Sequence, residues 1–369
     1  MFAIPQVLYY NIRTMKNTLN QIPVPLLTWY EEHKRTLPWR SDPVPYKVWL
    51  SEIMLQQTRV AAVLPYFARF LEACPTVSHL AATELDSVLK LWQGLGYYSR
   101  ARSLHKTAQI LCDQYGGEFP ADYDALRALP GIGDYTAAAI SSIAFGLPTP
   151  VVDGNVLRVV TRLTADNGDV LKQPTKRRIT AALADVIPTK AAAAFNQAMM
   201  ELGALICLPN GAPLCKSCPL AFCCQAYGDD TMHCYPVKSP KKPRRIEERT
   251  VYFVLHNRRL ALRQRPEKGL LAGLYEYPNE CEAPTWHISG HCEPQSLMAK
   301  HIFTHIEWHM TAVIIRTDDE TLPAGWLWAT RQELTRRYTI PSAFSAFSPL
   351  VEQLFAEPDS PISFIPGAR

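Results

Sequence analysis

Two acidic side chains lie in segments whose other residues are mostly apolar, where a carboxyl group could carry out acid–base chemistry. Glu52 interrupts the helical run WLSEIML, and Asp153 follows Val151 and Val152 and begins the helical pattern DGNVLRVV. Burial would raise the pKa of Glu52 and let it deliver a proton. A helix N-terminus would keep Asp153 ionised and able to stabilise a developing cation. Such a pair suits the cleavage of a glycosidic bond.

Each of these residues also has an ordinary structural interpretation. Glu52 could lie on a half-exposed helix face and pair with Lys47 or Arg59. Asp153 could be only the N-cap of its helix, which is the commoner role of Asp at that position. The two residues taken alone leave both interpretations open.

Ten cysteines are present, and five of them fall between positions 207 and 224. In a chain without a secretory signal, such crowding favours metal or catalytic use over a disulfide framework. The gaps of seven, two and five residues allow one short loop to gather four thiolates, from Cys207, Cys215, Cys218 and Cys224. An iron–sulfur cluster and a four-cysteine zinc site both fit this spacing, and Cys223 competes for the last position.

Gly131 and Gly133, in LPGIGDYTAAAI, predict a tight turn between two helices. Glycine lets the backbone approach a phosphate closely, and the start of the second helix offers free N–H groups and positive potential. This is the arrangement of a helix-hairpin-helix. A packing turn is the alternative for so short a motif, and the VVDGNVLRVVTRL that follows favours phosphate binding. Asp134, also in this turn, would oppose a phosphate.

The elements that must position these residues fall into two groups. Apolar residues recur at helical spacing up to the cysteine cluster. Later in the chain the pattern alternates: TVYFVLHN and LALRQR predict two strands that flank a turn near Asn257 and Arg258, HIFTHIEWHMTAVIIR predicts a strand pair or one long strand, and SPLVEQLF predicts a closing helix. The basic, proline-rich PVKSPKKPRRIEER separates the two patterns as a linker. We therefore expect five parts: an N-terminal extension (residues 1–20), an all-α domain (21–206), a cysteine loop (207–224), a linker (225–249) and an α+β domain (250–369).

The length of 369 residues suits two domains. No apolar run is long enough for a membrane helix, and the N-terminus lacks the cationic start of a secretory signal. The net charge of +4 is mild, and its basic excess lies before position 251. Charge alone is weak support for a DNA partner.

The motifs together resemble the helix-hairpin-helix DNA glycosylases with an iron–sulfur loop and, within them, the MutY group of adenine glycosylases. The resemblance runs from about Leu37 to the tail. It rests on the cysteines and on LPWR, WLSEIMLQQTRV, LWQGLGYYSRAR, LPGIGDYTAAAI, VVDGNVLRVVTRL, FNQAMMELGALIC, GLLAGLYEYP and FTH. It implies an all-α helix-hairpin-helix domain, a [4Fe-4S] cluster on the four cysteines, and an α+β Nudix-like domain.

The resemblance also implies an activity, the excision of adenine opposite 8-oxoguanine or guanine in base excision repair. Glu52 would protonate N7 of the extruded adenine, and Asp153 would stabilise or capture the oxocarbenium ion. Tyr135 and Asn155 would position Asp153 and the sugar. Tyr135 stands where the endonuclease III group has a lysine, and a phenol cannot form a Schiff base, so we expect a monofunctional enzyme.

Further contacts follow from the same resemblance. Arg40 and Gln197 would hold the adenine edge. Gln57 and Tyr97 would wedge into the base stack, and Thr58 and Leu95 would contact the oxidised guanine. In the second domain the loop Phe303, Thr304 and His305 would recognise 8-oxoguanine, with threonine where the family has serine. The acidic magnesium-binding helix of Nudix hydrolases is absent after GLLAGLYEYP.

The partner expected from the resemblance is double-stranded DNA with an A:8-oxoguanine or A:G mispair, and the linker could bind other repair proteins. We expect a monomer without a membrane span, located in the cytoplasm and associated with the nucleoid if the source is bacterial. Two alternatives remain: a bifunctional glycosylase for oxidised pyrimidines, and a non-catalytic lesion-binding module in which Glu52 and Asp153 have only structural roles.

Overall fold

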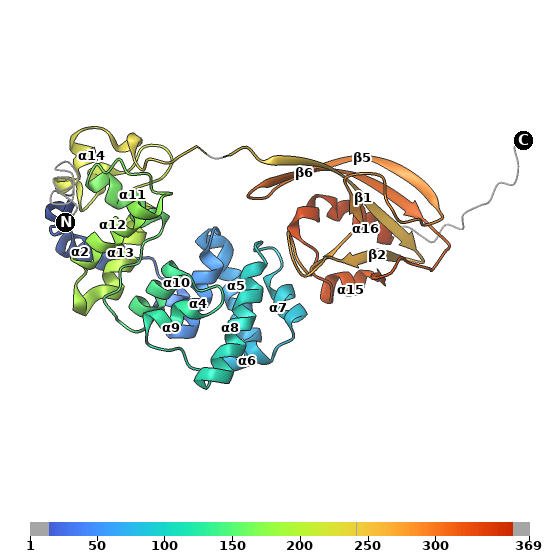
Figure 1. The fold of residues 1–369 in the computed structure, drawn as a ribbon, viewed down its shortest axis with the longest axis horizontal. Helices are drawn as coiled ribbons and strands as arrows, with labels where there is room; N and C mark the ends of the chain where they lie inside the picture. The colour runs from blue at the N-terminus through green and yellow to red at the C-terminus, as the bar shows by residue number, and fades with distance from the viewer. Residues whose placement is uncertain (1–14, 241, 357–369) are drawn as a thin grey trace, which may run out of the picture. The chain divides into compact units, whose positions relative to one another are not determined.

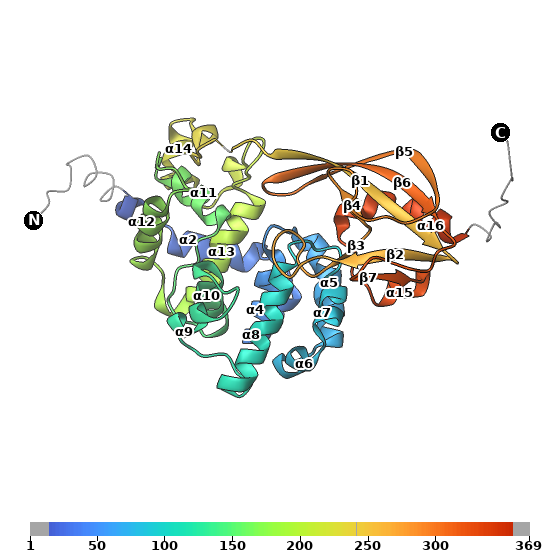
Figure 2. The ribbon, with the colours of Figure 1, turned by 45° about the vertical axis from the view of Figure 1, so that its right-hand side comes forward.

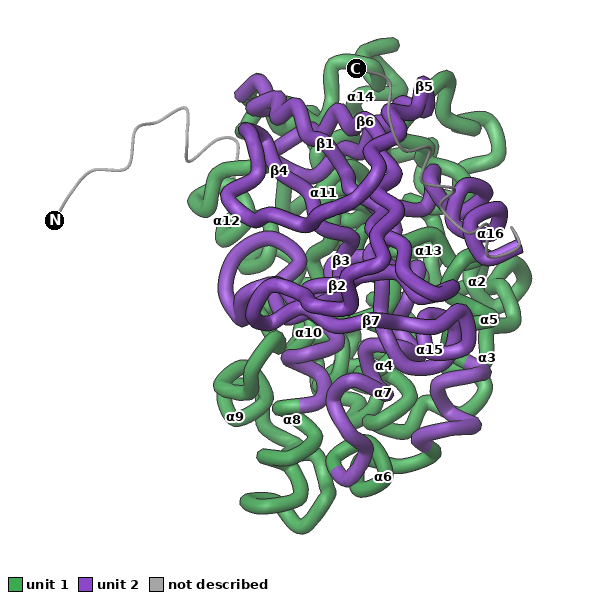
Figure 3. The backbone as a smooth tube through the Cα atoms, turned by 90° about the vertical axis from the view of Figure 1, so that its right-hand side faces the viewer, with its two compact units in different colours: residues 1–67, 75–81, 106–241 green, residues 68–74, 82–105, 242–369 purple. Residues whose placement is uncertain are grey.

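The structure, a computed structural model, describes residues 15–240 and 242–356. Its elements are helical as far as α14 (Gln225–Gly228), and strands predominate after that (Figure 1). The chain divides into two compact units (Figure 3). Unit 1 comprises residues 1–67, 75–81 and 106–241, and unit 2 comprises residues 68–74, 82–105 and 242–369. Part of the helical half of the sequence therefore packs with the strands of the other half.

The helices of unit 1 are mostly short. Three of them begin at a proline, at Pro23, Pro38 and Pro45, whose fixed φ suits the first helical position. The helices that lie wholly or partly in unit 1, besides α14, are α2 (Pro23–His33), α3 (Pro38–Ser41), α4 (Pro45–Leu55), α5 (Val60–Ala73), α6 (Val77–Ala82), α8 (Ser99–Tyr115), α9 (Tyr123–Ala128), α10 (Asp134–Ala139), α11 (Gly154–Leu163), α12 (Gln173–Ala184) and α13 (Ala192–Leu205).

An apolar core joins α2, α11 and α13. Met15 and Leu19 belong to this core, so the described end of the predicted N-terminal extension packs with the helical domain. Lys16 adds an ion pair with Asp185 on the surface. The rest of that predicted extension, residues 1–14, lies outside the described residues.

Unit 2 contains α7 and a seven-stranded sheet of order β3-β2-β1-β6-β5, with β4 paired to β1 and β7 to β2 (Figure 2). β1 runs parallel to β6, and the other pairs are antiparallel. The bounds are α7 (Leu85–Trp92), β1 (Arg245–His256), β2 (Arg259–Gln264), β3 (Tyr275–Glu276), β4 (Asn279–Glu280), β5 (His291–Ile302), β6 (Ile306–Arg316), β7 (Trp326–Ala329), α15 (Arg331–Arg336) and α16 (Ser348–Ala356).

The first turn of this sheet lies where the alternation predicts it, and HIFTHIEWHMTAVIIR contains a turn between two strands rather than one long strand. Asn257 and Arg258 connect β1 to β2, and both have positive φ, as a tight hairpin turn requires. Residues 303–305 connect β5 to β6. The predicted closing helix is α16, whose Leu350 and Leu354 belong to the core beside the sheet.

Regular structure enters the range 225–249 that the sequence predicts as a linker. It contains α14, a 3₁₀ turn at Met232–Cys234 and the first residues of β1. β1 begins this early because Arg245 pairs with Ile306 at the start of the parallel ladder with β6.

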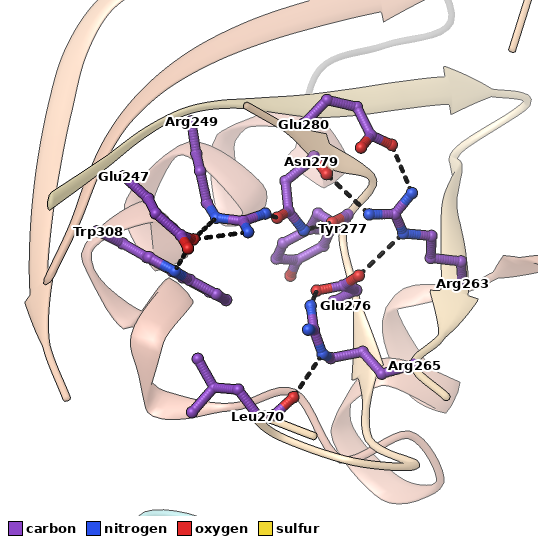
Figure 4. A network of polar contacts seen from close by, with 10 residues as sticks. All are labelled: Glu247, Arg249, Arg263, Arg265, Leu270, Glu276, Tyr277, Asn279, Glu280 and Trp308. Carbon is purple, nitrogen blue, oxygen red and sulfur yellow. Dashed lines mark hydrogen bonds and ion pairs between the residues drawn. The ribbon is translucent and has the colours of Figure 1, made fainter. Parts of the chain in front are cut away.

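A buried polar network braces the sheet of unit 2 (Figure 4). The Glu276 carboxylate, 2% exposed, accepts hydrogen bonds from Arg263 at 2.9 Å and from Arg265 at 2.6 Å. Arg265 also donates to the carbonyl of Leu270 at 2.8 Å, so the network fixes the loop after β2. In the described ranges, no helix is both long and apolar enough to cross a membrane.

Candidate active site

A cavity of about 660 Å³ in unit 1 brings together many of the predicted site residues. The residues come from α3, α4, α10, α11, α13 and the turn after α4, which lie far apart in sequence. Those that line the cavity are Arg40, Glu52, Gln57, Thr58, Tyr135, Asp153, Asn155 and Gln197.

Glu52 lies on the buried side of α4 and is 5% exposed. The Tyr135 hydroxyl donates a hydrogen bond of 2.5 Å to its Oε2. Burial, the largest cause, and the nearby Asp153 raise the pKa of Glu52 to about 7, against the opposing effects of Tyr135 and Arg40. The pairing with Lys47 that would make Glu52 structural does not occur, because Lys47 pairs with Asp42.

Asp153 is both the N-cap of α11 and a wall of the cavity. Its Oδ1 accepts from the Val156 amide at 2.7 Å, and its Oδ2 accepts from Asn155 Nδ2 at 2.7 Å. The pKa of Asp153 is raised above its ordinary value, because burial outweighs these hydrogen bonds and Arg158, which lower it. Asn155 thus makes the expected contact with Asp153, while the Tyr135 hydroxyl is bound to Glu52 instead.

The cavity wall that carries Arg40 contains a cluster of ion pairs around Glu201, which the sequence did not predict. Glu201, 1% exposed, accepts from Arg35 Nε at 2.7 Å and from Arg40 Nη2 at 2.8 Å. The two guanidinium groups lower the pKa of Glu201 to about 2 against the effect of burial. Glu201 follows Gln197 by one helical turn of α13, and this i, i+4 spacing was its only sequence signal.

Arg158 links the cavity to the cysteine loop. The sequence did not predict this role of Arg158. Its Nη2 donates to Asn155 Oδ1 and to the Gly203 carbonyl, both at 2.8 Å. Its Nε donates to the carbonyl of Cys207, also at 2.8 Å. A continuous series of hydrogen bonds therefore runs from Asp153 through Asn155 and Arg158 to the first cysteine of the loop.

The four predicted cysteine ligands line one small apolar cavity next to α11: Cys207, Cys215, Cys218 and Cys224. Cys223 is not part of this lining, and its thiol faces the Leu220 carbonyl at 3.5 Å. Arg162 donates to the Cys207 sulfur at 3.3 Å.

Without a bound cation, the surroundings of these thiols favour their neutral forms. Burial, the largest cause, together with mutual repulsion raises the pKa of Cys218 to about 12 and of Cys224 to about 11. Four thiols that line one cavity have the chemistry of a metal–sulfur site, and a bound cation would favour their thiolate forms. In this structure, however, neither these four cysteines nor any other group of three or more His, Cys, Asp or Glu side chains among the described residues is arranged as a bound metal ion needs.

The glycine turn lies between α9 and α10, as predicted. Gly131 has φ +75°, a left-handed conformation that glycine adopts without strain. Gly133 is the extended N-cap of α10. Asp134 pairs with Arg127 at 3.6 Å on the surface, so a neighbouring cation offsets its charge.

A second cavity, of about 570 Å³, lies within unit 2 and gathers the other predicted contacts. Its lining comes from the turn between α7 and α8, from the loop after β2 and from the β5–β6 hairpin. The predicted residues among them are Leu95, Tyr97, Phe303, Thr304 and His305.

Backbone strain marks both predicted wedge residues. Gln57 has φ 58° and Tyr97 has φ 48°, although neither is a glycine. Such strained positions concentrate at functional sites. Tyr97 is 47% exposed, and Arg100 lies over its ring at 5.5 Å.

Comparison with protein families matches both halves of the chain. Residues 50–189 match a family described as "HhH-GPD superfamily base excision DNA repair protein", and residues 250–348 match a NUDIX domain. The predicted order, a helix-hairpin-helix domain followed by a Nudix-like domain, is confirmed.

Solved structures resemble the helical part. A thermostable thymine-DNA glycosylase is 27% identical with a TM-score of 0.53, covering 58% of this chain and 98% of that chain. Endonuclease III in a non-covalent DNA complex is 27% identical with a TM-score of 0.50 and the same coverage.

Two relatives are similar over most of their length. The adenine DNA glycosylase of Mus musculus is 34% identical over 379 residues, covering 84% of this chain and 73% of the relative. That of Buchnera aphidicola subsp. Baizongia pistaciae is 34% identical over 296 residues, covering 78% of this chain and 83% of the relative. The predicted family is confirmed: the chain belongs to the adenine DNA glycosylases, enzymes of base excision DNA repair.

Proposed function

We propose that the protein hydrolyses the N-glycosidic bond of adenine mispaired with 8-oxoguanine or guanine in duplex DNA. The observation that carries the proposal is the pair of carboxyl groups in the 660 Å³ cavity. With a pKa of about 7, Glu52 keeps its proton in a large fraction of molecules at neutral pH. Asp153 accepts two hydrogen bonds that favour its ionised form.

The two carboxyl groups have different tasks in this mechanism. Glu52 donates its proton to N7 of the extruded adenine, which makes the base a leaving group. Asp153 stabilises the oxocarbenium ion or captures it, before water completes hydrolysis. The Tyr135 hydroxyl orients the carboxyl group of Glu52 through their hydrogen bond, and the Asn155 amide orients Asp153.

Arg40 and Gln197 hold the edge of the adenine in this proposal. Both line the same cavity as Glu52. Arg40 is fixed from behind by Glu201 and by the Arg35 carbonyl, which accepts from its Nη1 at 3.2 Å. A guanidinium that is fixed before the base arrives loses little entropy when it binds.

Recognition of the opposite base belongs to the second cavity. Leu95 and Tyr97 line it together with the loop Phe303–Thr304–His305. The loop is tight, because the Phe303 amide donates to the Ile306 carbonyl at 2.8 Å. Gln57 and Thr58 contribute from the turn after α4, as a wedge and a guanine contact respectively. The glycine turn at Gly131 and Gly133 binds a phosphate.

A [4Fe-4S] cluster on the four cysteines would cross-link their loop. The cavity that these cysteines share supports this assignment. Iron analysis and visible absorbance of the purified protein distinguish it from a zinc site. About four irons per chain with a broad absorption near 400 nm is the expected result, and one zinc would contradict it.

Single-turnover excision on a panel of duplexes tests the function. We expect release of adenine opposite 8-oxoguanine and opposite guanine, and no release of an oxidised pyrimidine or of thymine opposite guanine. Excision of the pyrimidine would favour a bifunctional glycosylase, and no excision from any duplex would favour a lesion-binding module.

Replacement of Tyr135 by lysine tests the monofunctional part of the proposal. A lysine amine can form a Schiff base with the aldehyde of the abasic deoxyribose, and a phenol cannot. Borohydride should therefore trap Tyr135→Lys on DNA covalently and should trap the unmodified protein hardly at all. Strong trapping of the unmodified protein would contradict the proposal.

A further inference from the structure

Arg102 connects two distant segments of unit 2. It lies in the first turn of α8, shortly after Tyr97, and its Nη2 donates to the carbonyl of Ala272 at 2.8 Å. Arg102 and residues 269–272 line the same 570 Å³ cavity as Tyr97. One hydrogen bond thus joins the segment that carries the wedge residue to the opposite wall of the cavity.

That wall has a backbone conformation that other parts of the structure must hold. Leu271 has φ 55°, which is unfavourable for a residue other than glycine, and Gly269 and Gly273 also have positive φ. From the sheet side, Arg265 donates to the Leu270 carbonyl at 2.8 Å (Figure 4). From α8, Arg102 donates to the carbonyl of Ala272, two residues after Leu270.

The guanidinium group of Arg102 also occupies the space beside Gly273. A Cβ atom added there would lie 2.3 Å from Arg102 Nη2. A side chain at position 273 and the guanidinium therefore cannot share this space. The glycine and the arginine act as one contact.

We propose that Arg102 is a positioning residue for the recognition of 8-oxoguanine. By fixing Leu271 and Ala272 relative to Tyr97, it sets the width of the cavity in which the opposite base is read. 8-Oxoguanine differs from guanine only by the oxygen at C8 and the hydrogen at N7, so its recognition needs a wall that does not move. The inference rests on the proposed function.

Lys90 supplies a matched control. Its Nζ donates to the carbonyls of Leu334 and Tyr338, both at 2.9 Å, so it also ties a helix of unit 2 to the strand-rich part. Lys90 is absent from the lining of the recognition cavity. Lys90→Met therefore removes docking contacts of the same kind without touching the wall at residues 269–273.

The experiment measures single-turnover excision of adenine opposite 8-oxoguanine and opposite guanine by the full chain. Arg102→Met should reduce the ratio of the two rates at least tenfold, and the loss should fall mainly on the 8-oxoguanine duplex. Arg102→Lys should retain part of the ratio, because an ammonium group can still donate to the Ala272 carbonyl. Lys90→Met should keep the ratio within twofold.

Gly273→Ala is a second variant in case Arg102→Met does not fold. Its methyl group displaces the guanidinium and also strains a backbone with φ +63°, and both effects disturb the wall that Arg102 holds. The ratio should therefore fall here too, with thermal unfolding measured in parallel. If Arg102→Met folds and keeps the ratio of the two excision rates unchanged, the inference is overturned. If only Gly273→Ala folds, an unchanged ratio in that variant overturns it. An equal fall in Lys90→Met would also overturn it. No preference for 8-oxoguanine in the unmodified protein would instead refute the proposed function.

Discussion

Glu52 combines two properties that a general acid at neutral pH needs: burial, and a hydroxyl group that fixes its orientation. Burial raises the pKa of this carboxyl group to about 7, and the Tyr135 hydroxyl keeps the group within the cavity. The cost of such a residue falls on stability, because an ionised carboxylate at this site lacks water.

This cost gives a pH-dependent prediction for Glu52→Gln. The folded pKa of about 7 exceeds the ordinary value of 4.5, so the folded state favours the protonated form. Stability from this group is complete below pH 4.5 and is lost as the pH rises through 7, by about 3 kcal/mol in total. The Gln variant has no such proton to lose.

Urea unfolding at pH 5 and pH 8 measures the difference. Relative to the unmodified protein, Glu52→Gln should gain stability at pH 8, on the order of 2–3 kcal/mol more than at pH 5. Tyr66→Phe, in the same domain but outside the lining of this cavity, serves as the control. The same pH dependence in all three proteins would show that Glu52 is not buried in the way described.

At the scale of elements, α11 joins the two chemical centres of unit 1. Its N-terminus carries Asp153, and Arg158, one turn later, donates to both Asn155 and the Cys207 carbonyl. A change in the cysteine loop therefore reaches Asp153 through two side chains.

Arg158→Met should weaken both centres. The substitution leaves the buried Gly203 carbonyl without its donor, which costs about 1–3 kcal/mol, and it removes the part-buried hydrogen bonds to Asn155 and to the Cys207 carbonyl. We expect adenine excision to fall at least tenfold and the visible absorbance to bleach faster under a chelator. Arg158→Lys keeps the charge without the forked geometry, so its excision rate and bleaching rate should lie between those of the unmodified protein and of Arg158→Met. Unchanged excision and bleaching in the Met variant would exclude this coupling.

The sequence predicted the elements better than the partners of individual side chains. Glu52 and Asp153 were visible because a charge interrupts an apolar run, and the turns at Gly131 and Asn257 because of their residue types. Arg35 and Glu201 are 166 positions apart, and nothing local marks their pairing. The grouping of residues 82–105 with the strand-rich part is likewise invisible to periodicity, because it depends on long-range contacts such as that of Arg102 with Ala272.

For the whole molecule, binding to duplex DNA should depend strongly on salt. The net charge is only +4, so phosphate contacts must come from local groups such as the glycine turn. A protein that neutralises about three phosphates loses roughly 40-fold in affinity between 50 and 200 mM salt. Fluorescence anisotropy with the inactive Glu52→Gln variant measures this, and an affinity independent of salt would argue against phosphate contacts.

The pH profile of single-turnover adenine excision is the most direct test of the division between an acid and a cation stabiliser. On a duplex with adenine opposite 8-oxoguanine, the rate should fall about tenfold per pH unit above 7. Glu52→Gln should bind the duplex normally and lose at least 100-fold in rate at pH 7 and below, in line with the contribution of a general acid of roughly 10²–10⁴-fold. The gap to the unmodified protein should narrow above pH 7, where Glu52 loses its proton. Excision at a near-normal rate by this variant, or a rate of the unmodified protein that stays constant up to pH 9, would contradict the account.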